Sequence, residues 1–365
     1  MLSLDLPKWY DLHTHFRQGP SMAAYIKAHL EMGCAGVIAM PNTKPPVSLI
    51  SGPGNERAWS IEQYMEMVRQ AGGDAFQCLI VPLYLTKDTS PSLIDEGSAS
   101  GLLRACKYYP PHGTTNSEHG VPMSKWIGSA VFKRLEETET VLCIHGEQHG
   151  LPGESYLGSK TSAEAQFYRE FMPRLLDAHP DLRIVCEHVT SKEAVAFVQS
   201  AGERVAATVT PQHLLYTLGH LIQGLRYHLY CLPIVKFEED RLALREAVTA
   251  EGQRQFFAGT DSAPHTSKAT ECGCAAGCYV GGCAPQLYAM AFEASGVDLA
   301  SDTGRGAFQR FLCDNGPSFY GLQTRDERFL LERAPGKSRI LETEEGRIVP
   351  LPVGMDLALS WRISI

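Results

Sequence analysis

Two histidines separated by a single residue, His13 and His15, are the first side chains in this chain that can do chemistry together. They follow the mainly apolar residues 9–12, which predict a β-strand. Because alternate side chains of a strand leave the same face, both imidazoles point to one side of it. Two imidazoles on one face can share a metal ion, and a pair of surface histidines is the alternative that the spacing alone leaves open.

Further residues of the kind that a metal site needs stand at the ends of four later predicted strands: Lys107, His145, His188 and Asp261. Taken singly, each has an ordinary explanation, such as a surface lysine, a hydrogen-bonded core histidine or a helix cap. Taken with the first pair, they make four imidazoles, one carboxylate and one lysine. That set suits a hydrolytic centre with two metal ions.

The elements that must position these residues alternate between strand and helix along the chain. The predicted strands are residues 9–12, 37–40, 78–83, 102–107, 141–144, 184–187, 205–210 and 256–259. The predicted helices are residues 21–32, 61–70, 92–99, 124–137, 162–178 with a kink at Pro173, 192–200, 240–251, 285–293 and 305–313. Eight alternations without a linker or repeat predict an α/β fold, a single (β/α)8 barrel of the TIM type. We expect one domain over residues 1–365, with the last forty residues as short strands or an extended tail.

A long loop and a cysteine-rich loop interrupt this pattern. Residues 108–122 contain Thr114 and Thr115 among prolines and glycines, and loops of that length inside a compact domain are usually functional. Most of the eleven cysteines lie in apolar runs as reduced core thiols do. Four others stand close together: Cys272, Cys274, Cys278 and Cys283. Their spacing is not that of a standard zinc finger, so free thiols in a tight loop are favoured over a zinc knuckle.

Composition restricts the partners of the chain. Its 365 residues are 44% hydrophobic and 20% charged, with a formal net charge of -8, as in an ordinary globular protein. Such a charge provides no basic field for nucleic acid or an anionic membrane surface, so we expect a small-molecule partner. No signal peptide or membrane span is expected either, and the cytosol is the expected location.

The order and wording of the motifs add a resemblance. The matching stretches are residues 13–15, 40–42, 107–110, 114–117, 145–147, 187–188, 210–213, 230–233, 259–265 and 315–317. In these stretches, spread from Trp9 to Gly321, the chain resembles the dihydroorotases of the bacterial, single-function class in the amidohydrolase superfamily. It departs from them at residues 148–160 and at residues 272–283, where the alanine that contacts substrate stays ambiguous between Ala275 and Ala276.

The resemblance implies a centre with two zinc ions. His13, His15 and Asp261 would bind one ion, His145 and His188 the other, and a carboxylated Lys107 would bridge them. A lysine held between cations is pushed towards the neutral amine, which can add carbon dioxide to form an anionic bidentate carbamate. A hydroxide between the metals would be the nucleophile, with Asp261 as the general acid and base.

The reaction that the resemblance implies is the reversible interconversion of N-carbamoyl-L-aspartate and dihydroorotate in pyrimidine biosynthesis. Its substrate-binding residues would be Arg17, Asn42 and His265 at the carboxylate, Leu232 through its backbone, and His145, Thr114 and Thr115. The guanidinium of Arg17 offers a planar fork of donors that matches a carboxylate. The oligomeric state is left open, with a homodimer as one option.

Other readings of the same residues are weaker. A hydrolase of hydantoin, dihydropyrimidine or allantoin rings would leave Arg17 without an anion, which is costly for a buried guanidinium. An inactive barrel that serves as a scaffold would be expected to lack ligands, and none is missing here. A nucleophile built from Cys143 and His145 would take a ligand from the metals. His149 is an alternative ligand to His145, but it lies in the loop, so His145 is preferred.

Overall fold

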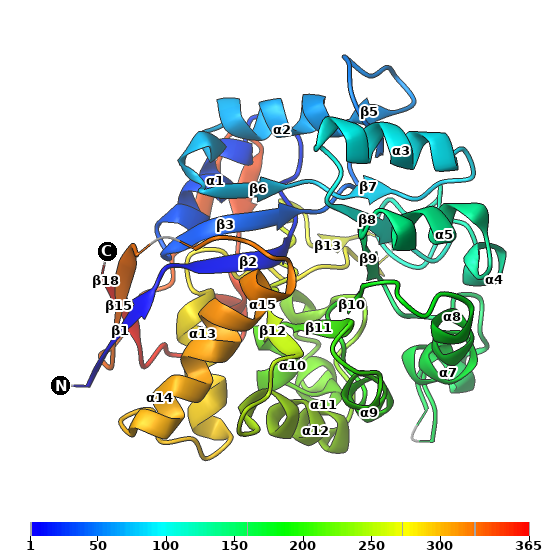
Figure 1. Ribbon diagram of the computed structural model, residues 1–365. Coiled ribbons are helices and arrows are strands. Elements are labelled where there is room, and N and C mark those ends of the chain that lie inside the picture. The colour runs from blue at the N-terminus through cyan, green and yellow to red at the C-terminus, as the bar shows by residue number, and fades with distance from the viewer. Residues whose placement is uncertain (1, 159, 272, 325, 365) are drawn as a thin grey trace.

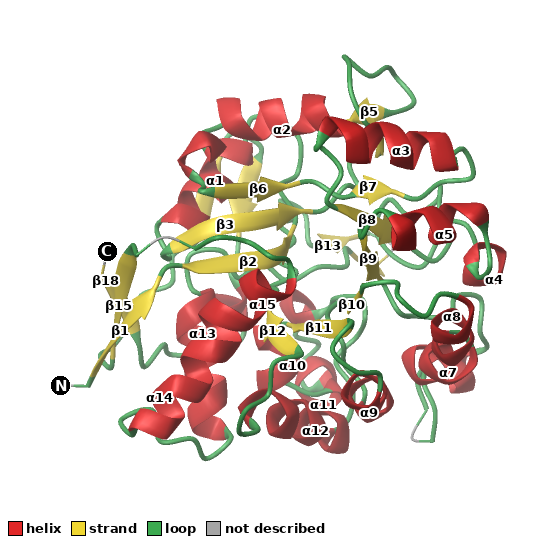
Figure 2. Ribbon diagram, viewed as in Figure 1, coloured by secondary structure: helices red, strands yellow, loops and turns green. Residues whose placement is uncertain are grey.

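The computed structural model describes residues 2–158, 160–271, 273–324 and 326–364. Parallel strands form an inner layer and helices surround it, as the sequence predicts (Figures 1 and 2). The inner strands are β2 (Trp9–Thr14), β3 (Cys34–Ala39), β6 (Cys78–Ile80), β7 (Leu83–Tyr84), β8 (Ala105–Tyr108), β9 (Val141–Ile144), β10 (Ile184–Cys186), β11 (Val205–Val209) and β12 (Phe256–Ala258).

These strands pair in chain order in two groups, β2-β3-β6 and β7-β8-β9-β10-β11-β12. The groups separate at Val81 and Pro82, so the predicted strand 78–83 is divided into β6 and β7. A proline supplies no N–H to a ladder, which accounts for the interruption. At the other end, Asp261 N donates to His13 O at 2.8 Å and His15 N donates to Ser262 O at 3.0 Å. The first and last inner strands therefore meet where three predicted metal ligands stand.

The outer layer consists mainly of helices that follow the strands. They are α1 (Met22–Leu30), α2 (Ile61–Gln70), α3 (Pro91–Ser100), α4 (Met123–Trp126), α5 (Ala130–Glu137), α7 (Ala163–Glu170), α8 (Met172–Ala178), α9 (Lys192–Ser200), α12 (Glu238–Thr249), α13 (Ala284–Ala294) and α14 (Asp302–Gln309). The single helix predicted over residues 124–137 is wrong, because Gly128 takes φ 74° and separates α4 from α5. The helix predicted over residues 162–178 divides at Phe171, where Pro173 enters the first turn of α8, since proline is tolerated there but not inside a helix.

Short helices were absent from the prediction. They are α6 (Gly153–Tyr156), α10 (Pro211–Leu215), α11 (Leu218–Ile222), α15 (Asn315–Phe319) and α16 (Leu351–Gly354). Segments of four or five residues are too short to show a helical period, so hydrophobic spacing cannot reveal them.

Serine side chains fix where several of the helices begin. Ser60, Ser90, Ser129, Ser162, Ser191 and Ser301 each accept a hydrogen bond from the backbone N–H three residues further on. Such caps satisfy one of the free donors of the first turn, and each typically contributes about 1 kcal/mol. The local sequence therefore sets the starts of α2, α3, α5, α7, α9 and α14.

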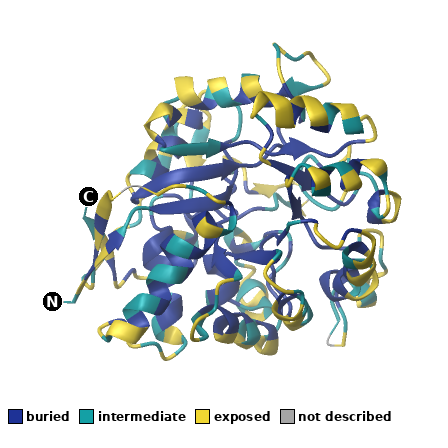
Figure 3. Ribbon diagram, viewed as in Figure 1, coloured by how far each residue is buried: buried dark blue, intermediate teal, exposed yellow. Residues whose placement is uncertain are grey.

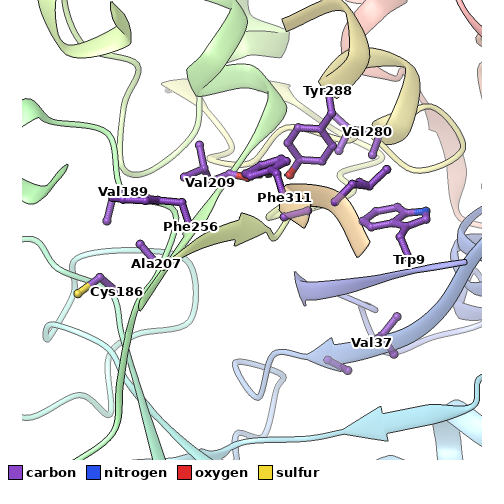
Figure 4. Close-up of a cluster of buried hydrophobic side chains, with 14 of the residues drawn as sticks. Trp9, Val37, Cys186, Val189, Ala207, Val209, Phe256, Val280, Tyr288 and Phe311 are labelled. Atoms are coloured by element: carbon purple, nitrogen blue, oxygen red, sulfur yellow. Dashed lines mark hydrogen bonds between the residues drawn. The ribbon is translucent and has the colours of Figure 1, made fainter. Parts of the chain in front are cut away.

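The inner strands are buried on both faces, with Cys78 and Leu79 of β6 as half-buried exceptions (Figure 3). In β11, Val205, Ala207 and Val209 pack outwards against the helices, whereas Ala206 belongs to the cluster inside the ring of strands. Figure 4 shows the outer cluster, in which Val209 and Phe311 lie beside Tyr288 of α13. The same alternation places Lys107 on the inward side with Ala105, because the two residues are two positions apart in β8.

The remaining strands lie outside the inner layer. They are β1 (Ser3–Pro7), β15 (Arg328–Glu332) and β18 (Arg362–Ser364) in one antiparallel sheet, and the pairs β4 (Val47–Leu49) with β5 (Trp59–Ser60), β13 (Ala269–Thr270) with β14 (Gly273–Cys274), and β16 (Leu341–Thr343) with β17 (Gly346–Ile348). Short strands in the last forty residues were expected from the sequence. Among the described residues, no helix is long and apolar enough to cross a bilayer.

Candidate metal centre and substrate pocket

The side chains at the strand ends meet around one pocket. Its lining includes the following predicted site residues: His13, His15, Arg17, Asn42, Thr114, Thr115, His145, His188, Leu232 and Asp261. Tyr109, Ala263, Ala276 and Gly277 complete the lining. Residues from nearly the whole length of the chain therefore come together at the C-terminal ends of the inner strands, where barrels of this kind carry their active groups.

One group in the pocket has the arrangement of a metal site. The ligand atoms of His13, His15 and Asp261 all lie within 4.8 Å of one another, and the three side chains are buried. Asp261 Oδ1 is 2.9 Å from His15 Nε2 and 3.4 Å from His13 Nε2. Imidazole and carboxylate are the donors that zinc prefers, so this group can hold such an ion.

The other two predicted ligands lie next to this group. The ring centroid of His188 is 4.9 Å from that of His13 and 4.7 Å from that of His145. His145 Nε2 is hydrogen-bonded to Glu147 Oε2 at 3.0 Å, while His188 Nδ1 is buried and has no partner among the described residues. The pair thus has ring nitrogens available on the side of the pocket.

Lys107 lies beneath the pocket and not in its lining. Its side chain is fully buried, and Nζ has no hydrogen-bond partner among the described residues. Burial lowers the pKa of Lys107 and outweighs the nearby Glu187, Cys143 and Asp261, which act in the opposite direction. A buried amine with no acceptor is costly. This unsatisfied Nζ lies close to the imidazoles and the carboxylate of the pocket. A chemically modified lysine that binds a metal ion would no longer be unsatisfied, so the set of side chains suits a metal centre.

Two glutamates that the sequence prediction missed hold the imidazoles in place. Glu187 Oε2 accepts from His13 Nδ1 and from Thr208 Oγ1, both at 2.6 Å. Burial lowers the pKa of His13, but the Glu187 carboxylate and a hydrogen bond with Asp261 together outweigh it, and the pKa is raised. Glu147 Oε2 is hydrogen-bonded to His145 Nε2 in the same way. Carboxylates in this position fix the orientation of histidine ligands. Glu187 stands next to His188 in the sequence but contacts His13, so the sequence did not indicate this partner.

Two of the predicted ligands have an unusual backbone conformation. His188 has φ 39° and Asp261 has φ 49°, although neither is glycine. Non-glycine residues rarely adopt the left-handed region, and such strain tends to gather at functional sites. Glycine would relieve it but would remove the side chain, so the strain is consistent with selection for the imidazole and the carboxylate.

A buried aspartate, Asp11, supports the backbone before Asp261. It accepts from Thr260 N at 2.9 Å, from Thr260 Oγ1 at 2.6 Å and from His13 N at 3.4 Å, and its carboxylate lies 3.2 Å from His29 Nε2. These bonds tie β2 to the residue that precedes Asp261. The sequence prediction missed Asp11, because its partners lie in distant segments of the chain.

The pocket also carries a cation with no hydrogen-bond partner among the described residues. The guanidinium of Arg17 lines the pocket and makes no hydrogen bond with any described residue. Asn42 Nδ2 donates to Thr115 O at 2.9 Å, and Asn116 Nδ2 donates to Asn42 O at 2.8 Å. This exchange fastens the loop of Thr114 and Thr115 over the pocket. Arg17 is therefore open to an anion inside a closed site.

His265 is the one predicted carboxylate contact that stands apart from the pocket lining. Its Nε2 is 2.8 Å from Ala276 O, on the wall between this pocket and a small neighbouring cavity. Burial lowers the pKa of His265 to about 4, and Arg17 adds to that effect. Of the two candidate alanines, Ala276 lines the pocket and Ala275 does not.

The competing assignments find little support in the geometry. His149 is exposed, whereas His145 lines the pocket. The Cys143 thiol is buried and bonded to the Tyr320 hydroxyl at 3.3 Å, and burial raises its pKa well above the usual value, so it is not an activated nucleophile. Cys272 lies outside the described residues. The other three cysteines of the loop belong to no metal-binding group that the described residues form.

Comparison with known proteins places this site in a family. No family model matches the chain. A dihydroorotase from Aromatoleum aromaticum is 39% identical over 371 residues, which cover 100% of both chains. The chain belongs to the dihydroorotase family. A dihydroorotase from Halorhodospira halophila is 40% identical over 100% of this chain and 99% of its own.

Solved structures agree with this assignment. The chain matches the dihydroorotase of Saccharomyces cerevisiae, solved in complex with 5-fluoroorotic acid, with a TM-score of 0.85 and 26% identity over 100% of this chain and 99% of that one. A D-hydantoinase from Thermus matches with a TM-score of 0.70 and 14% identity over 98% and 82% of the two chains, which shows a shared fold only. The barrel predicted from the sequence is thus confirmed, and the family is metal-dependent.

Proposed function

We propose that the chain interconverts N-carbamoyl-L-aspartate and dihydroorotate, the ring-closing and ring-opening step of pyrimidine biosynthesis. The observation that carries this proposal is the convergence of two features on one pocket. A buried group of imidazoles and a carboxylate lines this pocket together with Arg17, whose guanidinium has no hydrogen-bond partner among the described residues. The first suits hydrolysis of an amide, and the second suits a ring that bears a carboxylate.

Two zinc ions fit the donor set. His13, His15 and Asp261 would hold one ion, His145 and His188 the other, and Lys107 as a carbamate would bridge them. When bound, the ions supply a nucleophilic hydroxide at neutral pH and polarise the amide carbonyl. The lowered pKa of Lys107, caused by burial, favours the neutral amine that adds carbon dioxide.

Asp261 is the group that moves the proton in this proposal. Burial raises the pKa of its carboxyl, but hydrogen bonds from His13 and His15 outweigh burial and hold it well below the usual range. The carboxylate is therefore ionised at neutral pH, as a metal ligand must be. Asp261 lines the pocket, and in this proposal it accepts a proton there and later gives that proton to the leaving nitrogen.

The remaining residues bind and orient the substrate. Arg17 would pair with the carboxylate, with Asn42 and His265 beside it. Thr114 and Thr115 would donate hydroxyl hydrogen bonds from the loop, and Leu232 would use its backbone. Because the loop is fastened to Asn42, it also excludes water from the reacting ring.

Metal analysis combined with assays on two rings tests the proposal. We expect about two zinc ions per chain and a kcat/KM for dihydroorotate at least about 10³-fold above that for dihydrouracil. A site built to bind a polar group strongly rejects the analogue that lacks it. Preference for dihydrouracil would assign the chain to the hydantoinase type of reaction, and the absence of bound metal from active enzyme would overturn the centre.

A further inference from the structure

A second buried lysine, Lys268, has a role that the proposed reaction does not use. It lies between Asp261 and the cysteine-rich loop, and its side chain is largely buried. Its Nζ donates to Tyr230 O at 2.5 Å, Ala275 O at 2.6 Å and Gly277 O at 2.5 Å. Three carbonyl acceptors require three N–H donors, which only the ammonium form of lysine supplies. Lys268 is therefore a cation whose donors are all used.

The three carbonyls belong to the two segments that build one wall of the pocket. Tyr230 is two residues before Leu232, and Ala275 and Gly277 flank Ala276. Leu232, Ala276 and Gly277 all line the pocket.

Further bonds join the same segments. Gly277 N donates to Tyr230 O at 3.0 Å, and Ala275 N donates to the backbone oxygen of Lys268 at 2.8 Å. His265, through its bond to Ala276 O, rests on this wall as well.

No regular element holds this wall in place. Residues 230–236 contain neither helix nor strand, and β14 ends at Cys274, so Ala275 to Gly277 follow in irregular backbone. Irregular buried backbone needs partners for its carbonyls, since a buried carbonyl without one is costly. Hydrogen bonds from a charged donor are among the strongest available. The ammonium of Lys268 thus provides these carbonyls with hydrogen bonds that a strand or a helix would provide elsewhere in the fold.

We propose that Lys268 is a positioning residue that sets the preference of the pocket for a ring bearing a carboxylate. It fixes the wall that Leu232, Ala276 and His265 form, and it adds a second positive charge near His265, beside that of Arg17. The lowered pKa of His265 agrees with this placement, because Lys268 is among its causes after burial and Arg17. The proposal rests on the proposed function for its substrate, although not for its geometry.

The test compares Lys268→Met, Lys268→Arg and the wild-type chain, all loaded with zinc. We expect Lys268→Met to raise KM for dihydroorotate, and the Kd for orotate measured by calorimetry, by at least about tenfold. Its kcat should stay within about threefold of wild type, and its zinc content should be unchanged. Lys268→Arg keeps the charge but replaces three diverging donors by a planar fork, so its KM should lie between the two.

A merely structural role would instead lower kcat, zinc content and thermal stability together. The KM of Lys268→Met for dihydroorotate would then stay close to that of the wild type. That result, or unchanged KM and Kd in Lys268→Met, would overturn the proposal. If Lys268→Met does not fold, an unchanged KM and Kd in Lys268→Arg would overturn the proposed role of the three Lys268 hydrogen bonds. A wild-type chain that turns over dihydrouracil but not dihydroorotate would refute the proposed function separately, and the Kd for orotate would still decide the role of Lys268.

Discussion

Two buried lysines lie near the same pocket, and they differ in their hydrogen-bond partners. Lys107 Nζ has no hydrogen-bond partner among the described residues, whereas Lys268 Nζ has three carbonyl acceptors. The described protein atoms leave the hydrogen-bonding capacity of Lys107 Nζ unused, whereas they satisfy that of Lys268 Nζ fully. An unsatisfied buried group in a native fold calls for an explanation by function, while a satisfied one is explained by architecture. The contrast separates the residues that perform chemistry from those that hold the substrate.

The largest expected effect belongs to Lys107, the unsatisfied lysine. Lys107→Ala should lose zinc and reduce kcat by more than about 10⁴-fold, because the metals carry most of the rate enhancement. Added short carboxylic acids should restore part of both. Metal analysis and a dihydroorotate assay check this together.

The matched control for that variant is Lys192→Ala, which removes an exposed lysine paired with Glu239 and should leave both quantities unchanged. A Lys107→Ala protein with two zinc ions and normal turnover would refute the bridge. Such a result would also mean that Lys107, like Lys268, has no part in the chemistry.

Asp261→Asn should give the next largest loss, a fall in kcat of about 10² to 10⁴-fold with the fold intact. An amide keeps the shape of the side chain but cannot accept the proton. Circular dichroism and thermal melting check the fold, and steady-state kinetics check the loss. Asp302→Asn, which changes an exposed carboxylate, is the control. Residual activity within about tenfold of wild type would remove Asp261 from the proton transfer.

Arg17→Met tests the binding of the substrate carboxylate. We expect KM for dihydroorotate to rise by about 10²-fold, since loss of one partner of a buried ion pair costs about 3 to 5 kcal/mol and part of that is recovered by solvent. Arg17→Lys keeps the charge without the fork and should fall in between. An equal loss for a ring without a carboxylate would show that Arg17 is structural.

The sequence brought the predicted ligands together because each of them lies at or just beyond the end of an apolar strand. His145 and His188, for example, come directly after apolar runs, and the strand-end rule for barrels then places them together. Helix starts were also readable, as at Ser60 and Ser191. The break at Gly128 was misjudged because apolar spacing continues across it.

The supporting contacts were beyond such reasoning. Glu187 meets His13 across 174 positions of sequence, and Asp11 meets Thr260 across 249. Lys268 gave no signal, since its acceptors are backbone carbonyls that any sequence possesses. Residues that act through tertiary contacts to backbone leave no pattern in a single sequence, whereas residues that act through their own chemistry do.

The smallest expected effect belongs to the loop that covers the pocket. Thr114 and Thr115 line the pocket, and the loop is fastened by Asn42 and Asn116 rather than by the threonine side chains. Replacing both threonines by alanine should therefore leave the loop closed and remove only two hydroxyl hydrogen bonds to substrate. At about 0.5 to 1 kcal/mol each, that loss lowers kcat/KM by about 5 to 30-fold.

The double variant Thr114→Ser with Thr115→Ser is the matched control, because it keeps both hydroxyls and removes only the methyl groups. It should retain most of the wild-type kcat/KM, while the alanine variant loses turnover as well as affinity. Unchanged kinetics in the alanine variant would show that the loop excludes water without touching the ring. A loss larger than that of Arg17→Met would show that the loop, and not the wall built on Lys268, carries most of the substrate binding.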